Sequence, residues 1–324
     1  MIKSLFIVIL LSVFVSCQNN RPRVEEGNSI QNNRHIEFNA DSAYLFVLEQ
    51  CHFGYRTPES KASQQCAEYL VKKFKNYNAE ITEQNFSATL WNGKSAKGKN
   101  IIASYNVENA NRIMLSAHWD SRATADHDPN PANWNKPIAG ANDGASGVAV
   151  LLELARLLAS NESKIGVDIV LFDLEDQGTP ENEKHSSENT WCLGSQYWAK
   201  NPHKAFYKPQ YGILLDMVGC NNPLFTKEGT SMYYCSGVMN TIWNKAKQMG
   251  YGGVFSDEET GSILDDHYYI NLMAKIPTID IIQYDRTTES HFFPHWHTVN
   301  DTPENVNKET MQIVGNVLVG LIKW

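Results

Sequence analysis

One histidine and several carboxylates follow apolar segments of the sequence, and a second histidine lies near the C-terminus. Imidazole nitrogens and carboxylate oxygens, with no thiolate, form a donor set that suits a catalytic zinc ion. In an open α/β sheet, side chains that follow the strands meet in the crevice beyond the carboxyl ends. The residues of this set are His118, Asp143, Glu175, Asp176, Asp216 and His297. Their types and positions therefore predict a zinc site.

The adjacent pair Glu175 and Asp176 indicates a division of labour, since one carboxylate can hold a metal ion while its neighbour transfers protons. Each motif also has a structural interpretation when it is taken alone. The His118-x-Asp120 motif could be a supporting feature, the Glu-Asp pair a solvated loop start, and Asp143 a helix cap within a turn. Because all of them fall at one predicted edge, the metal site is favoured.

Apolar runs predict the elements that must position this set. The segment 147–158 has only two charged residues, so most of its circumference should be buried as a helix. Strands are expected at 80–86, 99–106, 112–116, 167–172, 211–215 and 276–282, with two helices in 41–76 and others at 147–158, 237–249 and 308–322. This alternation implies an α/β fold. We expect a single-domain α/β/α sandwich with a mixed, mostly parallel, twisted central sheet and the active site at the carboxyl ends of its strands.

Two polar segments, 121–137 and 177–189, interrupt this alternation of strands and helices. Structureless loops of such length are uncommon in compact domains unless they are functional or disordered. Both segments directly follow candidate metal-binding residues. They are therefore interpreted either as rims of an active site or as surface decoration.

The N-terminus is typical of an export signal rather than of a folded element. A lysine at position 3 precedes a short apolar run that ends at Ser16 and Cys17. The run is shorter than the roughly 20 residues that span a bilayer. A cysteine after a small residue resembles a bacterial lipoprotein signal, and an ordinary secretory peptide cut elsewhere is the alternative. We expect a signal peptide at 1–16, a flexible tether at 17–36 and a catalytic domain at 37–324. The protein is expected to be exported to the periplasm and to contact the membrane only through a lipid on Cys17.

Composition and charge restrict the class of protein and its partners. Of the 324 residues, 42% are hydrophobic and 20% are charged, which excludes a disordered or polytopic membrane protein. The net charge of −8 and the lack of a Lys/Arg-rich run exclude nucleic acid as a partner. No Cys-x-x-Cys pair is present, which argues against a cysteine metal site. Beyond Cys17 the cysteines are Cys51, Cys66, Cys192, Cys220 and Cys235. One or two disulfides are permitted in an oxidising compartment, and their pairing stays open.

Taken in order, the motifs resemble those of the zinc aminopeptidase clan. Within that clan the chain is most similar to the zinc-dependent glutaminyl cyclases, also called glutaminyl-peptide cyclotransferases. The segments that carry the resemblance are 117–121, 140–147, 172–176, 214–216 and His297, and the discriminating ones are 263–267, 296–298 and Asp301. The resemblance covers residues 40–324 and is specific as an ordered set.

The resemblance implies a role for each residue of the set and adds an apolar slot for the substrate side chain. The implied roles are Asp143, Asp176 and His297 for one zinc ion, Glu175 for proton transfer, Asp216 and Asp265 for an acidic pair, and Trp296, Phe293 and, as a looser match, Trp191 for the slot. Asp176 departs from the pattern, because many relatives carry Glu there. Asp is one methylene shorter and remains a competent oxygen ligand.

The activity implied is the cyclisation of an N-terminal glutamine of peptides or proteins to pyroglutamate, with release of ammonia. The alternative is a di-zinc aminopeptidase that removes N-terminal residues from peptides, with His118 and Asp216 at a second zinc ion. Asp265 favours the cyclase, since the aminopeptidases usually carry a small hydroxyl residue at that position. A third class, a non-catalytic lipoprotein that binds peptides, is disfavoured because all ligands and Glu175 are present.

Overall fold

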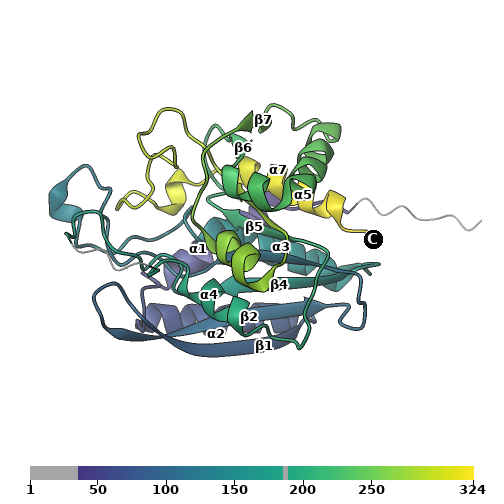
Figure 1. The fold of residues 1–324 in the computed structure, drawn as a ribbon, viewed down its shortest axis with the longest axis horizontal. Coiled ribbons are helices and arrows are strands. Elements are labelled where there is room, and N and C mark those ends of the chain that lie inside the picture. Colours follow the sequence, from purple (N-terminus) through teal and green to yellow (C-terminus); the bar gives the residue numbers. More distant parts are fainter. Residues whose placement is uncertain (1–35, 185–188) are drawn as a thin grey trace, which may run out of the picture. The chain divides into compact units, whose positions relative to one another are not determined.

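The computed structural model describes residues 36–184 and 189–324 (Figure 1). The predicted signal peptide, Cys17 and the predicted tether up to residue 35 lie outside the described residues. Within the described ranges, no helix has both the length and the apolar character needed to cross a membrane.

A six-stranded sheet forms the centre of the fold, in the order β1-β2-β4-β3-β5-β8. β1 and β2 form an antiparallel hairpin, and β2 also pairs antiparallel with β4. The strands β4, β3, β5 and β8 run parallel to one another. The strands are β1 (Glu80–Thr89), β2 (Ser95–Tyr105), β3 (Arg112–His118), β4 (Gly166–Phe172), β5 (Gly212–Asp216) and β8 (Thr278–Ile282). The expected mixed, mostly parallel sheet is confirmed.

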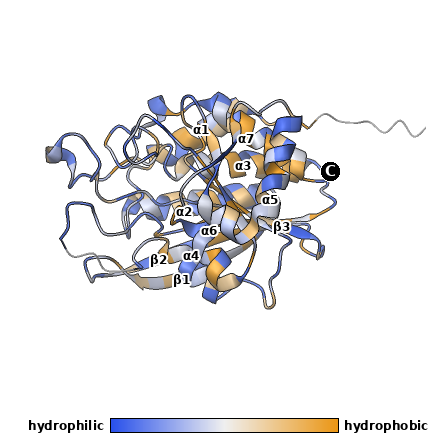
Figure 2. Ribbon diagram, turned by 45° about the horizontal axis from the view of Figure 1, so that its top comes forward, coloured by the Kyte–Doolittle hydropathy of each residue, from blue (hydrophilic) through white to orange (hydrophobic). Residues whose placement is uncertain are grey.

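Helices cover both faces of this sheet. The helices are α1 (Ala40–His52), α2 (Lys61–Asn76), α3 (Ala145–Ser160), α4 (Leu193–Lys200), α5 (Gly229–Gln248), α6 (Asp266–Tyr269) and α7 (Lys308–Leu321). On one face, α3 packs against β3 and β5 and is contacted by α1 and α7. On the other face, α4 contacts β2 while α6 contacts β5 and β8. In Figure 2, hydrophobic residues gather on α3 and α7, whereas the loops are mostly hydrophilic.

Strand residues alternate between two hydrophobic clusters, one on each face of the sheet. In β2, Ile101 and Ala103 join the cluster formed with α1, α3, α5 and α7. Ile102 lies between them in sequence and packs in the other cluster, with Trp198 of α4. This follows from the two-residue period of a strand. Burial on both faces explains why the central strands are nearly continuous apolar runs.

Several elements differ from those expected. A small parallel sheet of β6 (Phe225–Lys227) and β7 (Phe255–Glu259) was not predicted, nor were α4 and α6, because each is short and lacks a clear apolar period. The predicted helix at 237–249 begins earlier, at Gly229, and is interrupted at Cys235, which has non-helical dihedrals. The permitted disulfides are not formed, since all five cysteines in the described part of the chain are free.

A buried ion pair fixes the amino ends of β3 and β4. Arg112 Nε donates to Asp168 Oδ2 at 2.5 Å, and Arg112 Nη2 donates to Asp168 Oδ1 at 2.6 Å. Ser104 and Tyr207 donate their hydroxyls to the same carboxylate at 2.6 and 2.7 Å. Burial alone would raise the pKa of Asp168, but the hydrogen bonds from Arg112, Ser104 and Tyr207 hold it below its ordinary value.

Asp168→Ala should lower the free energy of unfolding by about 3–5 kcal/mol, because it leaves the Arg112 guanidinium buried without its partner. The contribution of Asp168 to stability is present above about pH 4 and is lost as the pH falls through its lowered folded-state pKa. Urea denaturation at pH 7 and at acidic pH measures both effects. Glu83→Ala, which breaks the exposed Glu83–Lys99 pair, is the control and should cost less than about 1 kcal/mol. Equal losses in the two variants would contradict the prediction.

Candidate metal centre and active site

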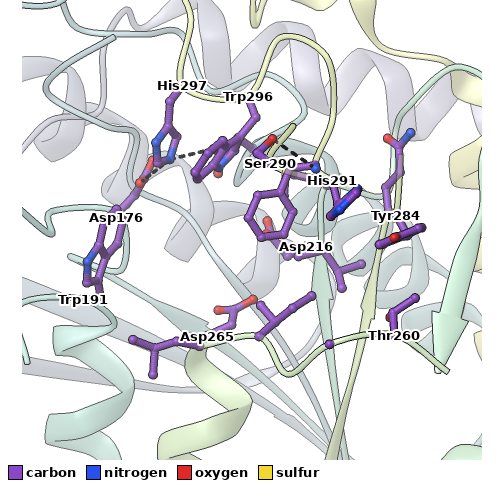
Figure 3. Close-up of a pocket in the computed structure, with 18 of the residues that line it drawn as sticks. Asp176, Trp191, Asp216, Thr260, Asp265, Tyr284, Ser290, His291, Trp296 and His297 are labelled. Atoms are coloured by element: carbon purple, nitrogen blue, oxygen red, sulfur yellow. Dashed lines mark hydrogen bonds and ion pairs between the residues drawn. The ribbon is translucent and has the colours of Figure 1, made fainter. Parts of the chain in front are cut away.

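The candidate residues meet at the carboxyl edge of the parallel strands. β3 ends at His118, β5 ends at Asp216, and Glu175 and Asp176 follow the end of β4 after two residues. A cleft of about 380 Å³ opens there (Figure 3). Its lining includes Asp143, Glu175, Asp176, Asp216, Asp265 and His297, with Trp191, Phe292 and Trp296 as aromatic walls. Every predicted site residue except His118 and Phe293 therefore lines the cleft, and His118 is buried in contact with Asp143 and Asp216.

The turn before α3 places Asp143 in this group. Gly144 adopts φ +94°, and a Cβ atom there would lie 2.9 Å from both the Asp120 carbonyl oxygen and His118 Cε1. Only glycine fits this left-handed, closely approached position. The backbone N–H groups of Asn142 and Asp143 donate to the two carboxylate oxygens of Asp301 at 2.8 and 3.1 Å. Asp301 therefore fixes the turn and leaves the Asp143 side chain free to face the cleft.

Asp143, Asp176 and His297 form a compact group of buried donors. One donor atom from each lies within 4.8 Å of the others. His297 Nε2 is 3.0 Å from Asp176 Oδ1 and 3.6 Å from Asp143 Oδ2, and in Figure 3 the side chains of Asp176 and His297 point toward one another. Asp143 Oδ2 and Asp176 Oδ2 are buried without a hydrogen-bond partner.

The protonation behaviour of this group fits a divalent cation. Burial raises the pKa of both Asp143 and Asp176. The negative charge of Asp176 adds to the shift of Asp143, whereas the positive charges of Arg122 and His118 oppose the shift of Asp176. Burial, followed by the positive charge of Arg122, lowers the pKa of His297, so that its imidazole is neutral. Two carboxylates and a neutral imidazole are ligands that zinc accepts, and a bound cation would satisfy the unpartnered oxygens.

His118 forms a second group with Asp143 and Asp216. Its Nε2 lies 3.0 Å from Asp143 Oδ1 and 3.3 Å from Asp216 Oδ1. Burial alone would lower the pKa of His118, but its contacts with Asp120, Asp143 and Asp216 raise it well above the ordinary value. In the structure as described, His118 therefore acts as a cation that links the two carboxylates. The same three residues are also close enough to hold a second metal ion.

Glu175 lies beside the first group, in a position suited to proton transfer. Asp120 accepts hydrogen bonds from the backbone N–H groups of Glu175 and Asp176 at 3.1 and 3.2 Å, which orients this turn. Burial raises the pKa of Glu175 well above its ordinary value, although the positive charge of His118 opposes the shift. The Cys192 thiol donates to Glu175 Oε1 at 3.1 Å. A carboxylate held in this way is a candidate general base near neutral pH.

Aromatic rings enclose the group at His297. The Trp296 ring stacks on the His297 ring with centroids 3.8 Å apart, and the Trp191 ring is parallel to it within 5° at 6.0 Å. The structure therefore brings Trp191 to the site, where its role could not be deduced from spacing. Phe293 does not itself line the cleft: it packs in an apolar cluster with Met217 and Ile282, against which the cleft-lining Phe292 and Trp296 also pack.

Three contributors to the site were missed in the sequence. Cys192 contacts Glu175, and the buried pair of Arg122 and Asp126 lies beside Asp176 and His297. Arg122 and Asp126 are spaced i, i+4 in the polar segment 121–137, which is the one local signal that could have drawn attention to them. Nothing in the sequence near Cys192 connects it with Glu175.

Asp143 belongs to both groups, so Asp143→Ala should abolish zinc binding. The loss should exceed the roughly 10–100-fold that removal of an outer-shell partner costs. His118→Ala should keep the zinc ion of the first group, because it removes none of Asp143, Asp176 and His297. Metal analysis of the purified variants by mass spectrometry, with circular dichroism as a check of folding, measures both results. Zinc retained by Asp143→Ala, or lost from a folded His118→Ala protein, would contradict this assignment.

Comparisons with known proteins agree with the fold. Residues 100–322 match the family described as Peptidase family M28. The crystal structure of Tannerella forsythia glutaminyl cyclase is 46% identical, with a TM-score of 0.87 over 88% of this chain and 98% of that chain. A Zn-dependent exopeptidase from Parabacteroides distasonis is 43% identical, with the same TM-score and the same coverage.

Among curated proteins, the glutaminyl-peptide cyclotransferase of Bothrops jararaca is 25% identical over 248 residues, or 68% of this chain. The chain spans 63% of that relative's length. The similar proteins thus include both cyclases and an exopeptidase. Because the family match covers more than half of the sequence, the chain belongs to peptidase family M28.

Proposed function

We propose that the protein cyclises the N-terminal glutamine of peptides and proteins to pyroglutamate and releases ammonia. The observation that carries the proposal is the buried carboxyl of Asp265, which lines the cleft together with Asp216. Burial, and then the negative charge of Asp216, raises the pKa of Asp265. An acid in this place favours the sharing of a proton with Asp216 over the binding of a second metal ion. A cyclase needs only one metal ion. The similarity to Tannerella forsythia glutaminyl cyclase supports the same choice.

Asp143, Asp176 and His297 would hold the single zinc ion. When bound, zinc supplies Lewis-acid polarisation of a carbonyl oxygen. The aromatic walls of Trp191, Trp296 and Phe292 can fold the methylene chain of the glutamine side chain and exclude water. This brings the α-amine to the γ-carboxamide carbon, and well-placed intramolecular partners reach effective molarities of about 10⁵ M or more.

Glu175 would move the protons of the reaction. A bond forms between the α-amino nitrogen and the γ-carbon, and the bond from that carbon to the amide nitrogen breaks. Glu175 accepts a proton from the amine and delivers one to the departing nitrogen, which leaves as ammonia. Because the Cys192 thiol engages Oε1, the other carboxylate oxygen stays free for this transfer.

A di-zinc aminopeptidase is the second candidate. It is favoured by the geometry of His118, Asp143 and Asp216, whose donor atoms lie within 4.8 Å of one another. The substrates of either enzyme would be peptides.

We also propose that the protein is exported to the periplasm and anchored to the membrane through a lipid on Cys17.

Ammonia release from a glutamine-initiated peptide and amine release from leucine amide, measured on one zinc-loaded sample, separate the two activities. We expect ammonia release with a single zinc ion per chain and no cleavage of leucine amide. Metal content is measured in the same sample. Cleavage of leucine amide with two zinc ions per chain would reject the cyclase and assign His118 and Asp216 as ligands.

Glu175→Gln should lower kcat about 10²–10⁴-fold, because the amide cannot accept the proton. The zinc content should be unchanged, since Glu175 is not one of the proposed ligands. Steady-state kinetics with a glutamine-initiated peptide measures the loss. Glu181→Gln changes an exposed side chain of a neighbouring loop and should keep wild-type activity. An active Glu175→Gln enzyme would exclude Glu175 as the proton carrier.

A further inference from the structure

The polar segment 121–137 is bonded to the loop that carries His297. His127 N–H donates to the His297 carbonyl oxygen at 3.2 Å, and Val299 N–H donates to Asp128 Oδ2 at 3.1 Å. Asp126 directly precedes His127, and its Oδ2 accepts the backbone N–H of Glu181 at 3.0 Å. Asp126 therefore stands where both polar segments meet the His297 loop.

The two ring nitrogens of His297 face different partners. Nε2 faces the carboxylates of Asp176 and Asp143. Nδ1 is buried without a hydrogen-bond partner, and Asp126 Oδ1 lies 3.7 Å away. A neutral imidazole that binds metal through one nitrogen keeps its proton on the other, and an acceptor there fixes the tautomer and the ring orientation.

Arg122 holds Asp126 in place through a bidentate ion pair. Its Nε and Nη2 donate to the two oxygens of Asp126 at 2.6 and 2.7 Å, and both side chains are at most 2% exposed. Arg122 Nη1 also donates to the Asp176 carbonyl oxygen at 3.1 Å. The guanidinium carbon lies 4.6 Å from the ring of Trp191, the ring that is parallel to His297. One buried pair thus contacts the segments of both Asp176 and His297.

We propose that Asp126 is a positioning residue for zinc: its carboxylate accepts the Nδ1 proton of His297, which leaves Nε2 free for the metal ion, and Arg122 fixes the carboxylate. The inference rests on the zinc ligands proposed above. It does not depend on whether the enzyme is a cyclase or an aminopeptidase. A distance of 3.7 Å is longer than a hydrogen bond. The contact is therefore expected to shorten when zinc fixes Nε2.

Asp126→Asn tests the proposal through zinc affinity, without reference to activity. In the variant, Arg122 Nη2 and the Glu181 N–H, the two donors to Oδ2, retain the amide oxygen, so the amide NH₂ takes the place of Oδ1, faces Nδ1 and opposes its proton. Competition with a chromophoric chelator at constant pH should show zinc binding weakened about 10–100-fold. Asp128→Asn is the matched control, because Asp128 also bonds the segment to the His297 loop but not to the imidazole. Its zinc affinity should stay within about threefold of the wild type.

The double variant Arg122→Met/Asp126→Asn keeps the test valid if the single variant does not fold. It removes the guanidinium with its partner, so no unpaired charge stays buried, and it should show the same loss of zinc affinity. Wild-type zinc affinity in the Asp126 variants would overturn the inference. An equal loss of zinc affinity in Asp128→Asn would also overturn it, because the segment would then act only by supporting the His297 loop. If the wild-type protein binds no zinc, the proposed ligand set is wrong. If the wild-type protein binds zinc and the Asp126 variants bind it equally tightly, only this inference is wrong.

Discussion

The site depends on how the protein neutralises carboxylates that the sheet gathers in one buried place. Asp143, Glu175, Asp176, Asp216 and Asp265 are all less than 10% exposed. Buried carboxylates without partners oppose folding, and they either take up protons or bind a cation. His118 supplies a positive charge between Asp143 and Asp216, and a divalent cation at His297 would satisfy Asp143 and Asp176. Metal binding and the stability of this edge of the sheet therefore depend on the same buried charges.

Much of the fold followed from local patterns. The central strands are continuous apolar runs because both of their faces are covered, so the expected strands at 112–116 and 167–172 match β3 and β4 within two residues. The wider set of candidate residues followed from the same logic, since residues at strand ends must meet at one edge, whereas the choice of Asp143, Asp176 and His297 as ligands came from the resemblance to the glutaminyl cyclases. The positions of Asp143 and Asp176 in the sequence were enough to predict that they lie at this edge of the sheet.

The supporting residues could not be placed in this way. Asp126 and His297 are far apart in sequence, and their proximity depends on two loops whose course no periodicity predicts. Cys192 reaches Glu175 from the start of α4, with φ at +55°, a backbone conformation that few side chains adopt. Phe292, and not the expected Phe293, lines the cleft, because a loop, unlike a strand, has no fixed alternation of faces.

The order of the strands in the sheet has a consequence for biosynthesis. β4 lies between β2 and β3, so the sheet cannot close until a strand made later inserts between two made earlier. The ligand set closes later still, because His297 follows the last strand of the sheet. Domains form from the N-terminus during synthesis, and a nascent chain that already carries Asp143 and Asp176 still lacks His297, the third member of their group. The complete ligand set therefore cannot assemble before the chain has been made as far as His297.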